Sequence, residues 1–239
     1  MAPKQLKLWE LAGDNADWSF SPFVWRVRFA LAYKSLPYEY QAWRFNDRDL
    51  IAPCKTVPTL DYGDKRMNES MDICKYLDTE FPDTPKLFDT ASGNVGIHFI
   101  NHWCDTVFVP TMFSLVIMPI YKGLTPEDQK YFRESREAGL GQTLEKYAGD
   151  KAQQAKQREA VQECLTPLRQ TLKSTKWLGG ERINYADLSV AGTFMLARAA
   201  GVELLDKDDP VYEWRERIFK EFEETINKNG KYRETRIET

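Results

Sequence analysis

Ser21 and Pro22 are the first residues in this 239-residue chain whose types and spacing could support chemistry. A serine oxygen accepts a backbone N–H at a helix start, and proline suits the first helical position. The pair therefore predicts a helix over residues 22–34. Its free N–H groups and the positive end of its dipole would face an anion, and a thiolate suits that place. A purely structural cap is the alternative, and Ser19 is close enough to compete for the chemical role.

A second group of candidate residues lies further along the chain, where Val57-Pro58 opens a predicted strand and Glu69-Ser70 opens a predicted helix. Proline cannot donate to a strand ladder, so it belongs at the first residue of its strand. A cis bond between Val57 and Pro58 would be consistent with that position. Ser70 is a second candidate N-cap with exposed N–H groups behind it. Two helix N-termini and one strand-opening proline thus fall within one small unit.

The elements that position these residues alternate between strand and helix. The first strand, helix and second strand form a βαβ unit, which implies a parallel pair joined by a right-handed crossover. The turn residues Gly63-Asp64 then join two antiparallel strands. The order β-α-β-β-β-α assigns residues 1–82 to one α/β domain: strand 6–11, helix 22–34, strand 38–43, strand 56–62, strand 65–68 and a helix from 69 to about 81.

The remainder of the chain reads as helical. Residues 83–92 are rich in Pro, Asp, Thr and Ser and are predicted to be a linker. The sequence around Asn184 and Asp187 has the pattern of a capping box, in which each side chain accepts a backbone N–H of the first turn. The predicted fold class is therefore α/β plus all-α. Its second part comprises a helical bundle at 93–230, with long helices from 126 to about 147 and from 153 to about 174, and a polar tail at 231–239.

Composition excludes several functional classes. The formal net charge is −3 with acids and bases interspersed, so we expect neither nucleic acid nor a membrane as partner. The least charged stretch, residues 106–121, contains Pro110 and Pro119, which should break it, and it is shorter than the roughly 20 residues of a membrane helix. The four cysteines lack metal-type spacing, and His98 and His102 lack a third ligand, so no metal is expected. These features favour a soluble, cytoplasmic protein.

The order of elements and the motifs resemble the cytosolic glutathione transferases. That family joins a thioredoxin-like N-terminal domain to an all-helical C-terminal domain. Residues 21–26 and 175–187 are similar to its etherase-related branch, which includes bacterial lignin β-aryl etherases and fungal etherase-like relatives. The motifs that carry the resemblance are Ser21-Pro22, Val57-Pro58, Glu69-Ser70 and the capping box of Asn184 and Asp187.

The resemblance implies glutathione as co-substrate and assigns residues to it. The Val57 backbone would pair with the cysteinyl unit beside Pro58. Ser70 and its helix N-terminus would take the α-carboxylate and Glu69 the ammonium, as the charges require. The glycyl carboxylate needs a cation, for which Arg44 and Lys55 are candidates, although both could equally be surface charges. Ser21 would stabilise the thiolate by a hydrogen bond.

The resemblance also implies that the thiolate attacks hydrophobic aromatic electrophiles, as in a detoxification enzyme. Cleavage of β-aryl ethers is one form of this reaction. The resemblance further implies a homodimer. The alternative is a non-catalytic protein of the ligandin type, which binds glutathione or hydrophobic ligands. The electrophile should lie between the two domains. Core packing or a dimer interface explains each candidate for its wall equally well; these candidates are Trp18, Trp103, Val107, Met112, Phe113, Leu115, Met118 and Tyr121.

Overall fold

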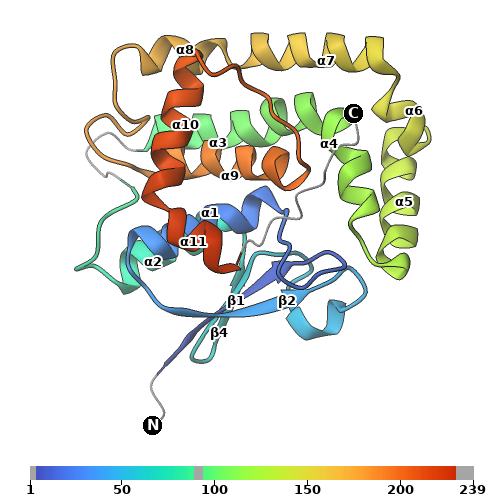
Figure 1. Ribbon diagram of the computed structural model, residues 1–239. Coiled ribbons are helices and arrows are strands. Elements are labelled where there is room, and N and C mark those ends of the chain that lie inside the picture. Colours follow the sequence, from blue (N-terminus) through green and yellow to red (C-terminus); the bar gives the residue numbers. More distant parts are fainter. Residues whose placement is uncertain (1–3, 89–93, 230–239) are drawn as a thin grey trace.

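A four-stranded sheet forms one end of the molecule, and helices α1 and α2 lie over it (Figure 1). The computed structural model describes residues 4–88 and 94–229. The strand order is β2-β1-β3-β4, in which β1 is parallel to β2 and antiparallel to β3, and β3 is antiparallel to β4. The elements are β1 (Leu6–Leu11), α1 (Pro22–Tyr33), β2 (Tyr38–Trp43), a short 3-10 helix (Arg48–Ile51), β3 (Thr59–Tyr62), β4 (Lys65–Asn68) and α2 (Ser70–Glu80).

The predicted β-α-β-β-β-α order is confirmed, with two local corrections. β3 begins at Thr59 rather than at residue 56, because the preceding residues form a loop that contains the cis Val57–Pro58 bond. Ser70 is the first helical residue of α2 and not its cap, so that prediction is wrong. Glu69 holds the cap position with φ of 70° and makes no side-chain capping bond.

Helices α3 (Val95–Trp103) and α4 (Val109–Lys122) form one continuous run, joined by a π-helical turn at Cys104–Phe108. The expectation that Pro110 and Pro119 break this stretch is therefore wrong. The wide turn comes immediately before Pro110, where a proline ring would otherwise meet the carbonyl one turn earlier. By length and composition alone the 28-residue run could cross a membrane, but core helices of soluble proteins pass the same test and 44% of its most apolar window is buried.

Two predicted long helices are each divided in the structure. Gly141 adopts φ of 66° and ends the first of them, because this left-handed conformation stops a helix at low cost only in glycine. Pro167 lacks an N–H and sits at the start of a separate helix, which interrupts the second. The resulting helices are α5 (Pro126–Leu140), α6 (Leu144–Ala148), α7 (Lys151–Cys164) and α8 (Thr166–Leu172), followed by α9 (Tyr185–Ala199), α10 (Pro210–Glu221) and α11 (Glu223–Asn229).

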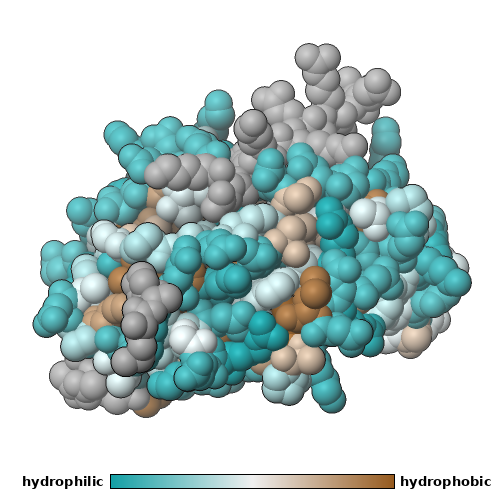
Figure 2. All heavy atoms as spheres, turned by 90° about the horizontal axis from the view of Figure 1, so that it is seen from below, coloured by the Kyte–Doolittle hydropathy of each residue, from teal (hydrophilic) through white to brown (hydrophobic). Residues whose placement is uncertain are grey.

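Helix α9 runs through the centre of the helical part, and almost all of its side chains are buried. Its predicted capping box is confirmed. The Asn184 side chain accepts the Ala186 N–H at 2.8 Å, and the Asp187 carboxylate accepts the Asn184 N–H at 3.1 Å. Asp187 also accepts the indole N–H of Trp214 at 3.0 Å, so the start of α9 is tied to α10. Viewed from the sheet side, the surface is mostly hydrophilic with small separate hydrophobic patches (Figure 2).

A glycine on α9 allows the helix to approach the first turn of α1. A Cβ on Gly192 would lie 2.7 Å from the Pro22 carbonyl oxygen and 3.0 Å from the Cγ of Arg26. Real Cβ atoms do not come that close to a backbone oxygen, so any side chain here would push the helices apart. The start of α1 is therefore held against the helical part by a contact that only glycine permits.

Replacing Gly192 with alanine should reduce the free energy of unfolding by about 1–3 kcal/mol, the usual cost of overpacking a core. The matched control is Gly139→Ala on α5, where a Cβ would meet nothing within 4 Å. That control should gain about 0.5–1 kcal/mol from improved helix propensity. Denaturant unfolding of the two variants beside the parent measures both effects. Equal stability of the Gly192 variant and the parent would contradict the close contact.

Candidate functional site

A cleft of about 570 Å³ separates the loops of the sheet domain from helices α4, α5 and α9. Ser21, Val57-Pro58 and Glu69-Ser70 all line it, so the structure brings together the motifs that the sequence singled out. Apart from Arg136 on α5, its opposite wall consists of apolar and aromatic side chains of the helical part, among them Phe113 on α4 and Leu196 on α9. One half of the cleft is thus polar with two helix N-termini, and the other half is mostly apolar.

Ser21 caps α1 and faces the cleft. Its side chain accepts the Val24 N–H at 3.4 Å, and 5% of the residue is exposed. Because the hydroxyl accepts this bond, its proton remains available to a second acceptor in the cleft. Ser19 is also buried but does not line the cleft, so of the two serines only Ser21 reaches it.

A buried ion pair lies beneath the segment that leads to Ser21. The Arg28 guanidinium on α1 bonds the Glu10 carboxylate on β1, and neither residue is exposed. Burial raises the pKa of Glu10 to about 7, while Arg28 opposes that rise. Arg28 also lies 4.5 Å from the Trp25 ring, whose indole N–H donates to the Ser19 carbonyl at 3.0 Å. Sequence reasoning missed this pair, although Glu10 shares the inward face of its strand with two buried leucines.

A tyrosine of the helical part binds the Ser70 side chain. The Tyr185 hydroxyl, at the start of α9, donates to the Ser70 hydroxyl oxygen at 3.1 Å. Burial raises the pKa of Tyr185, so its phenol keeps the proton that it donates. Ser70 can therefore direct its own proton into the cleft. Glu69 beside it is exposed and has a positive φ, a conformation that is uncommon for residues other than glycine and that gathers at functional sites.

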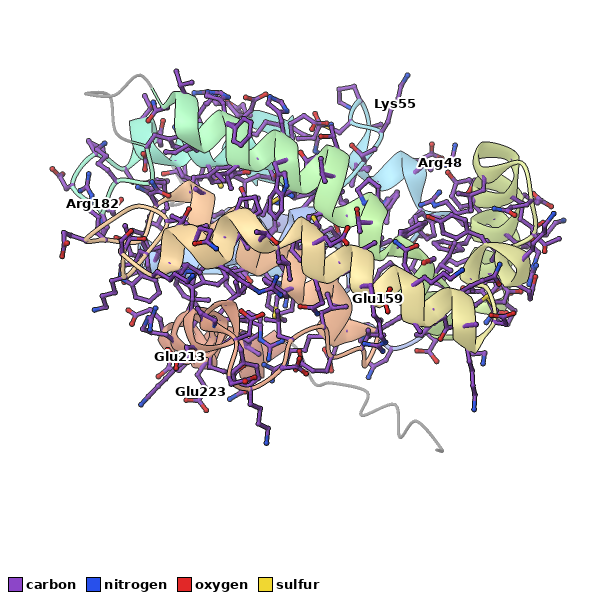
Figure 3. The ribbon with its side chains drawn as sticks, turned by 90° about the horizontal axis from the view of Figure 1, so that it is seen from above. Arg48, Lys55, Glu159, Arg182, Glu213 and Glu223 are labelled. Atoms are coloured by element: carbon purple, nitrogen blue, oxygen red, sulfur yellow. The ribbon has the colours of Figure 1, made fainter. Side chains whose placement is uncertain are left out.

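In the part of the chain that the structure describes, three basic side chains line the cleft: Arg48, Lys55 and Arg136. Figure 3 shows Arg48 and Lys55 on the same side of the molecule. Of the two predicted cations, only Lys55 belongs to this set. Arg44 does not line the cleft, because its Nε donates to the Gly13 carbonyl at 3.0 Å. Sequence reasoning missed Arg48 and Arg136, since neither belongs to a motif.

Of the eight candidates for the apolar wall, Phe113 is the only one in the cleft lining. Trp18 is instead buried, and its indole N–H donates to the Ala199 carbonyl at 3.1 Å. Trp103 stacks on Phe108 with ring centroids 5.3 Å apart. The others, which are Val107, Met112, Leu115, Met118 and Tyr121, also lie outside the lining. Helical periodicity identifies an apolar side of a helix, but it does not say whether that side faces a cleft, the core or solvent.

The aromatic wall comes mainly from elements that the prediction did not consider. Phe45 lies after β2, and Tyr131 and Phe132 belong to α5. The Phe45 ring lies 5.1 Å from that of Tyr131 and 6.2 Å from that of Phe132. Phe23, on the first turn of α1, adds an aromatic ring beside Ser21, and Phe20 and Trp43 also line the cleft. Within the described residues no group of three or more His, Cys, Asp or Glu side chains is arranged to hold a metal ion.

Comparison with known proteins identifies both parts of the chain. Residues 16–85 match the profile described as glutathione S-transferase, N-terminal domain, and residues 97–229 match that of the C-terminal domain. The probable glutathione S-transferase GSTF2 of Oryza sativa subsp. japonica is 27% identical over 213 residues, covering 86% of this chain and 88% of that protein.

Solved structures agree on the fold. Glutathione transferase GSTFuA3 from Phanerochaete chrysosporium superposes with a TM-score of 0.80 at 21% identity, covering 92% of this chain and 98% of that one. CsGST63524 of Ceriporiopsis subvermispora, solved in complex with glutathione, gives 0.79 at 19% identity, covering 92% and 97%. A thioredoxin-like domain with a four-stranded sheet, followed by a helical domain, is the fold of this family. The chain belongs to the glutathione S-transferase family.

Proposed function

We propose that this protein transfers glutathione to hydrophobic aromatic electrophiles, with Ser21 stabilising the reactive thiolate. The observation that carries the proposal is the position of Ser21. It caps α1 at the junction between the polar half of the cleft and the aromatic half. A sulfur held there would lie beside a hydroxyl donor and a helix N-terminus while facing an apolar ligand.

Glutathione fits the polar half by charge. The N-terminus of α2 and the Ser70 hydroxyl suit the α-carboxylate, and the exposed Glu69 carboxylate suits the ammonium. Val57 lines the cleft beside the cis-Pro58, and its backbone would pair with the cysteinyl unit as a strand-like partner. Lys55 lies on the same loop and is the cation that we assign to the glycyl carboxylate. The ordered tripeptide would then extend from Glu69 towards the aromatic wall with its sulfur at Ser21.

The reaction depends on the ionisation of the thiol. A free thiol has a pKa near 8.5, so only a few per cent is ionised at neutral pH. A hydrogen bond from Ser21 and the dipole of α1 both favour the thiolate over the thiol. The thiolate attacks an electrophilic carbon, the new C–S bond forms, and the leaving group departs with its electron pair. For a β-aryl ether the C–O bond breaks and the phenoxide takes a proton from water.

Cleavage of β-aryl ethers is the form of this reaction that we favour, because the cleft wall is rich in aromatic rings that suit flat aromatic substrates. The test incubates the protein with glutathione and a β-aryl ether that releases a fluorescent phenol, and in parallel with a chloronitrobenzene. Release of both products supports the transferase. Retention on immobilised glutathione without turnover of either compound would favour the ligandin-type alternative. The homodimer and the cytoplasmic location stay predictions.

Replacing Ser21 with alanine should lower kcat/KM at neutral pH by roughly 10- to 100-fold, the range for one lost hydrogen bond to a charged group. Without the hydroxyl, the pKa of bound glutathione should rise towards about 8.5, so the rate-against-pH profile should move upward. Initial rates with a chloronitrobenzene between pH 5.5 and 9.5 measure this shift. Thermal unfolding is recorded beside them, because the lost cap costs about 1 kcal/mol.

Ser19→Ala is the matched control for that experiment. Ser19 is close in sequence and equally buried but lies outside the cleft lining, so its removal should leave the profile in place. A shift caused by Ser19→Ala and not by Ser21→Ala would reassign the role to Ser19. An unmoved profile in both variants would leave Ser21 as a cap only.

Replacing Tyr185 with phenylalanine should raise the KM for glutathione by roughly 2- to 10-fold and leave kcat nearly unchanged. The phenol donates to Ser70, and one neutral hydrogen bond is worth about 0.5–1.5 kcal/mol. Steady-state kinetics at varied glutathione measures the split. Ser70→Ala should raise KM further, because it removes the group that meets the carboxylate. If Tyr185→Phe changed kcat alone, the tyrosine would not act through Ser70.

A further inference from the structure

Two guanidinium groups flank the aromatic cluster of Phe45, Tyr131 and Phe132 in the cleft. The Arg136 carbon Cζ lies 4.8 Å from the Phe132 ring centroid and 5.7 Å from that of Phe45. Arg48 lies 4.7 Å from the Tyr131 ring. Both arginines line the cleft, so its apolar half contains fixed positive charge as well as aromatic surface.

Arg136 has no carboxylate partner among residues 4–88 and 94–229, although it is half-buried. Its side-chain hydrogen bonds go to uncharged groups, the Ser135 hydroxyl at 3.0 Å and Tyr131. Burial lowers the pKa of Arg136, and the group that opposes this effect is Tyr131 rather than a carboxylate. Arg133 on the same helix behaves differently, because it pairs with Glu137 and Glu145, each at 2.7 Å. Holding a partly desolvated guanidinium without a neighbouring anion costs free energy of folding, and such charges are normally paired.

The charges of the cleft exceed what glutathione needs. Among the described residues, three cations line it, but Glu69 is the only acidic residue of the lining. The α-carboxylate of glutathione has Ser70 and a helix N-terminus, the thiolate has Ser21, and the glycyl carboxylate needs one cation. Lys55 shares a loop with Val57 and is the cation that we assign to the glycyl carboxylate. Arg136 projects from α5 in the aromatic half, so we assign it no part in holding the tripeptide.

We propose that the electrophile of this enzyme is an aromatic carboxylate, whose ring packs against Phe45 and Phe132 and whose carboxylate pairs with the Arg136 guanidinium. This inference rests on the proposed function, and it narrows the substrate from hydrophobic aromatics in general to those with an anionic group. Arginine suits the role because its planar fork binds a carboxylate through two parallel N–H donors. Aromatic rings on its flank hold the fork in place and exclude water from it.

The test compares two electrophiles of nearly equal shape, 4-chloro-3,5-dinitrobenzoate and 4-chloro-3,5-dinitrobenzamide. With either compound the glutathione thiolate forms a C–S bond at the ring carbon that carries chlorine, and chloride leaves with the electron pair of the C–Cl bond. Each kcat/KM is divided by the rate constant of the uncatalysed reaction with glutathione, which removes the difference in intrinsic reactivity. The parent protein should favour the carboxylate on this scale by roughly 10-fold or more.

Substitutions on α5 connect that preference to one side chain. Arg136→Gln should lower kcat/KM for the carboxylate by roughly 10- to 100-fold and for the amide by less than about 3-fold, because only the carboxylate loses a charged hydrogen bond. Arg136→Lys should keep part of the preference, since lysine retains the charge without the fork. Arg133→Gln is the matched control on the same helix, outside the cleft lining, and should leave the preference unchanged.

Three outcomes overturn the inference. Equal normalised kcat/KM of the parent protein for the amide and the carboxylate would mean that the cleft has no anion site for the electrophile. Equal loss for both electrophiles in Arg136→Gln, together with lower thermal stability, assigns the arginine to packing against the rings. Loss of preference in Arg133→Gln as well indicates a general charge effect. Activity with the amide distinguishes these results from failure of the proposed function. If the proposed function fails, neither electrophile reacts with glutathione faster in the presence of the protein than in its absence.

Discussion

The contact between the first turn of α1 and the middle of α9 is the constraint on which the rest of this structure depends. Helix α1 must present its N-terminus at the cleft, yet it is also the inner layer between the sheet and the helical domain (Figure 1). Gly192 lets α9 come within contact of the Pro22 carbonyl, one residue from Ser21. Because the contact is made by backbone on one side and by a missing side chain on the other, it leaves α1 little freedom to slide.

Two buried arginines hold α1 from opposite sides. They are two residues apart in sequence, so they leave the helix in different directions. Arg28 pairs with Glu10 on the sheet, whereas Arg26 donates to Asn101 at 3.0 Å and to Asp105 at 2.6 Å at the start of the helical domain. Buried ion pairs add little net stability compared with apolar packing, but they penalise every arrangement that separates the partners. Here they fix the orientation of the helix that carries Ser21.

Local sequence patterns predicted those parts of the site that depend on short-range chemistry. Neighbouring residues determine three of these features: the N-cap at Ser21, the proline that precedes β3 and the capping box at Asn184. Ser21 and the Val57-Pro58 segment both line the cleft. Ser70 shows the limit of this reasoning, because a positive φ at Glu69 moved the helix start by one residue. Such a backbone conformation depends on the surrounding structure and has no clear sequence signal.

The aromatic half of the cleft could not be predicted in the same way. Phe45, Phe132 and Arg136 come from two separate segments and meet only when α5 packs against the loop after β2. The candidates on the helical run before α5 were chosen by residue type, and most face the core or solvent instead. The wide turn at Cys104–Phe108 adds to this difficulty, since it changes the helical period that such a choice assumes.

The wide turn at Cys104–Phe108 also determines which way α4 faces. A π-helical turn holds one residue more than an α-helical turn, and each residue of an α-helix advances by about 100° around its axis. If the same residues closed as a regular α-helical turn, every side chain of α4 would point about 100° away from its present direction. Phe113 would then leave the cleft lining, while Ser21 and Ser70 on the sheet domain would stay in place. The extra residue in one turn of backbone therefore selects the side of α4 that the cleft receives.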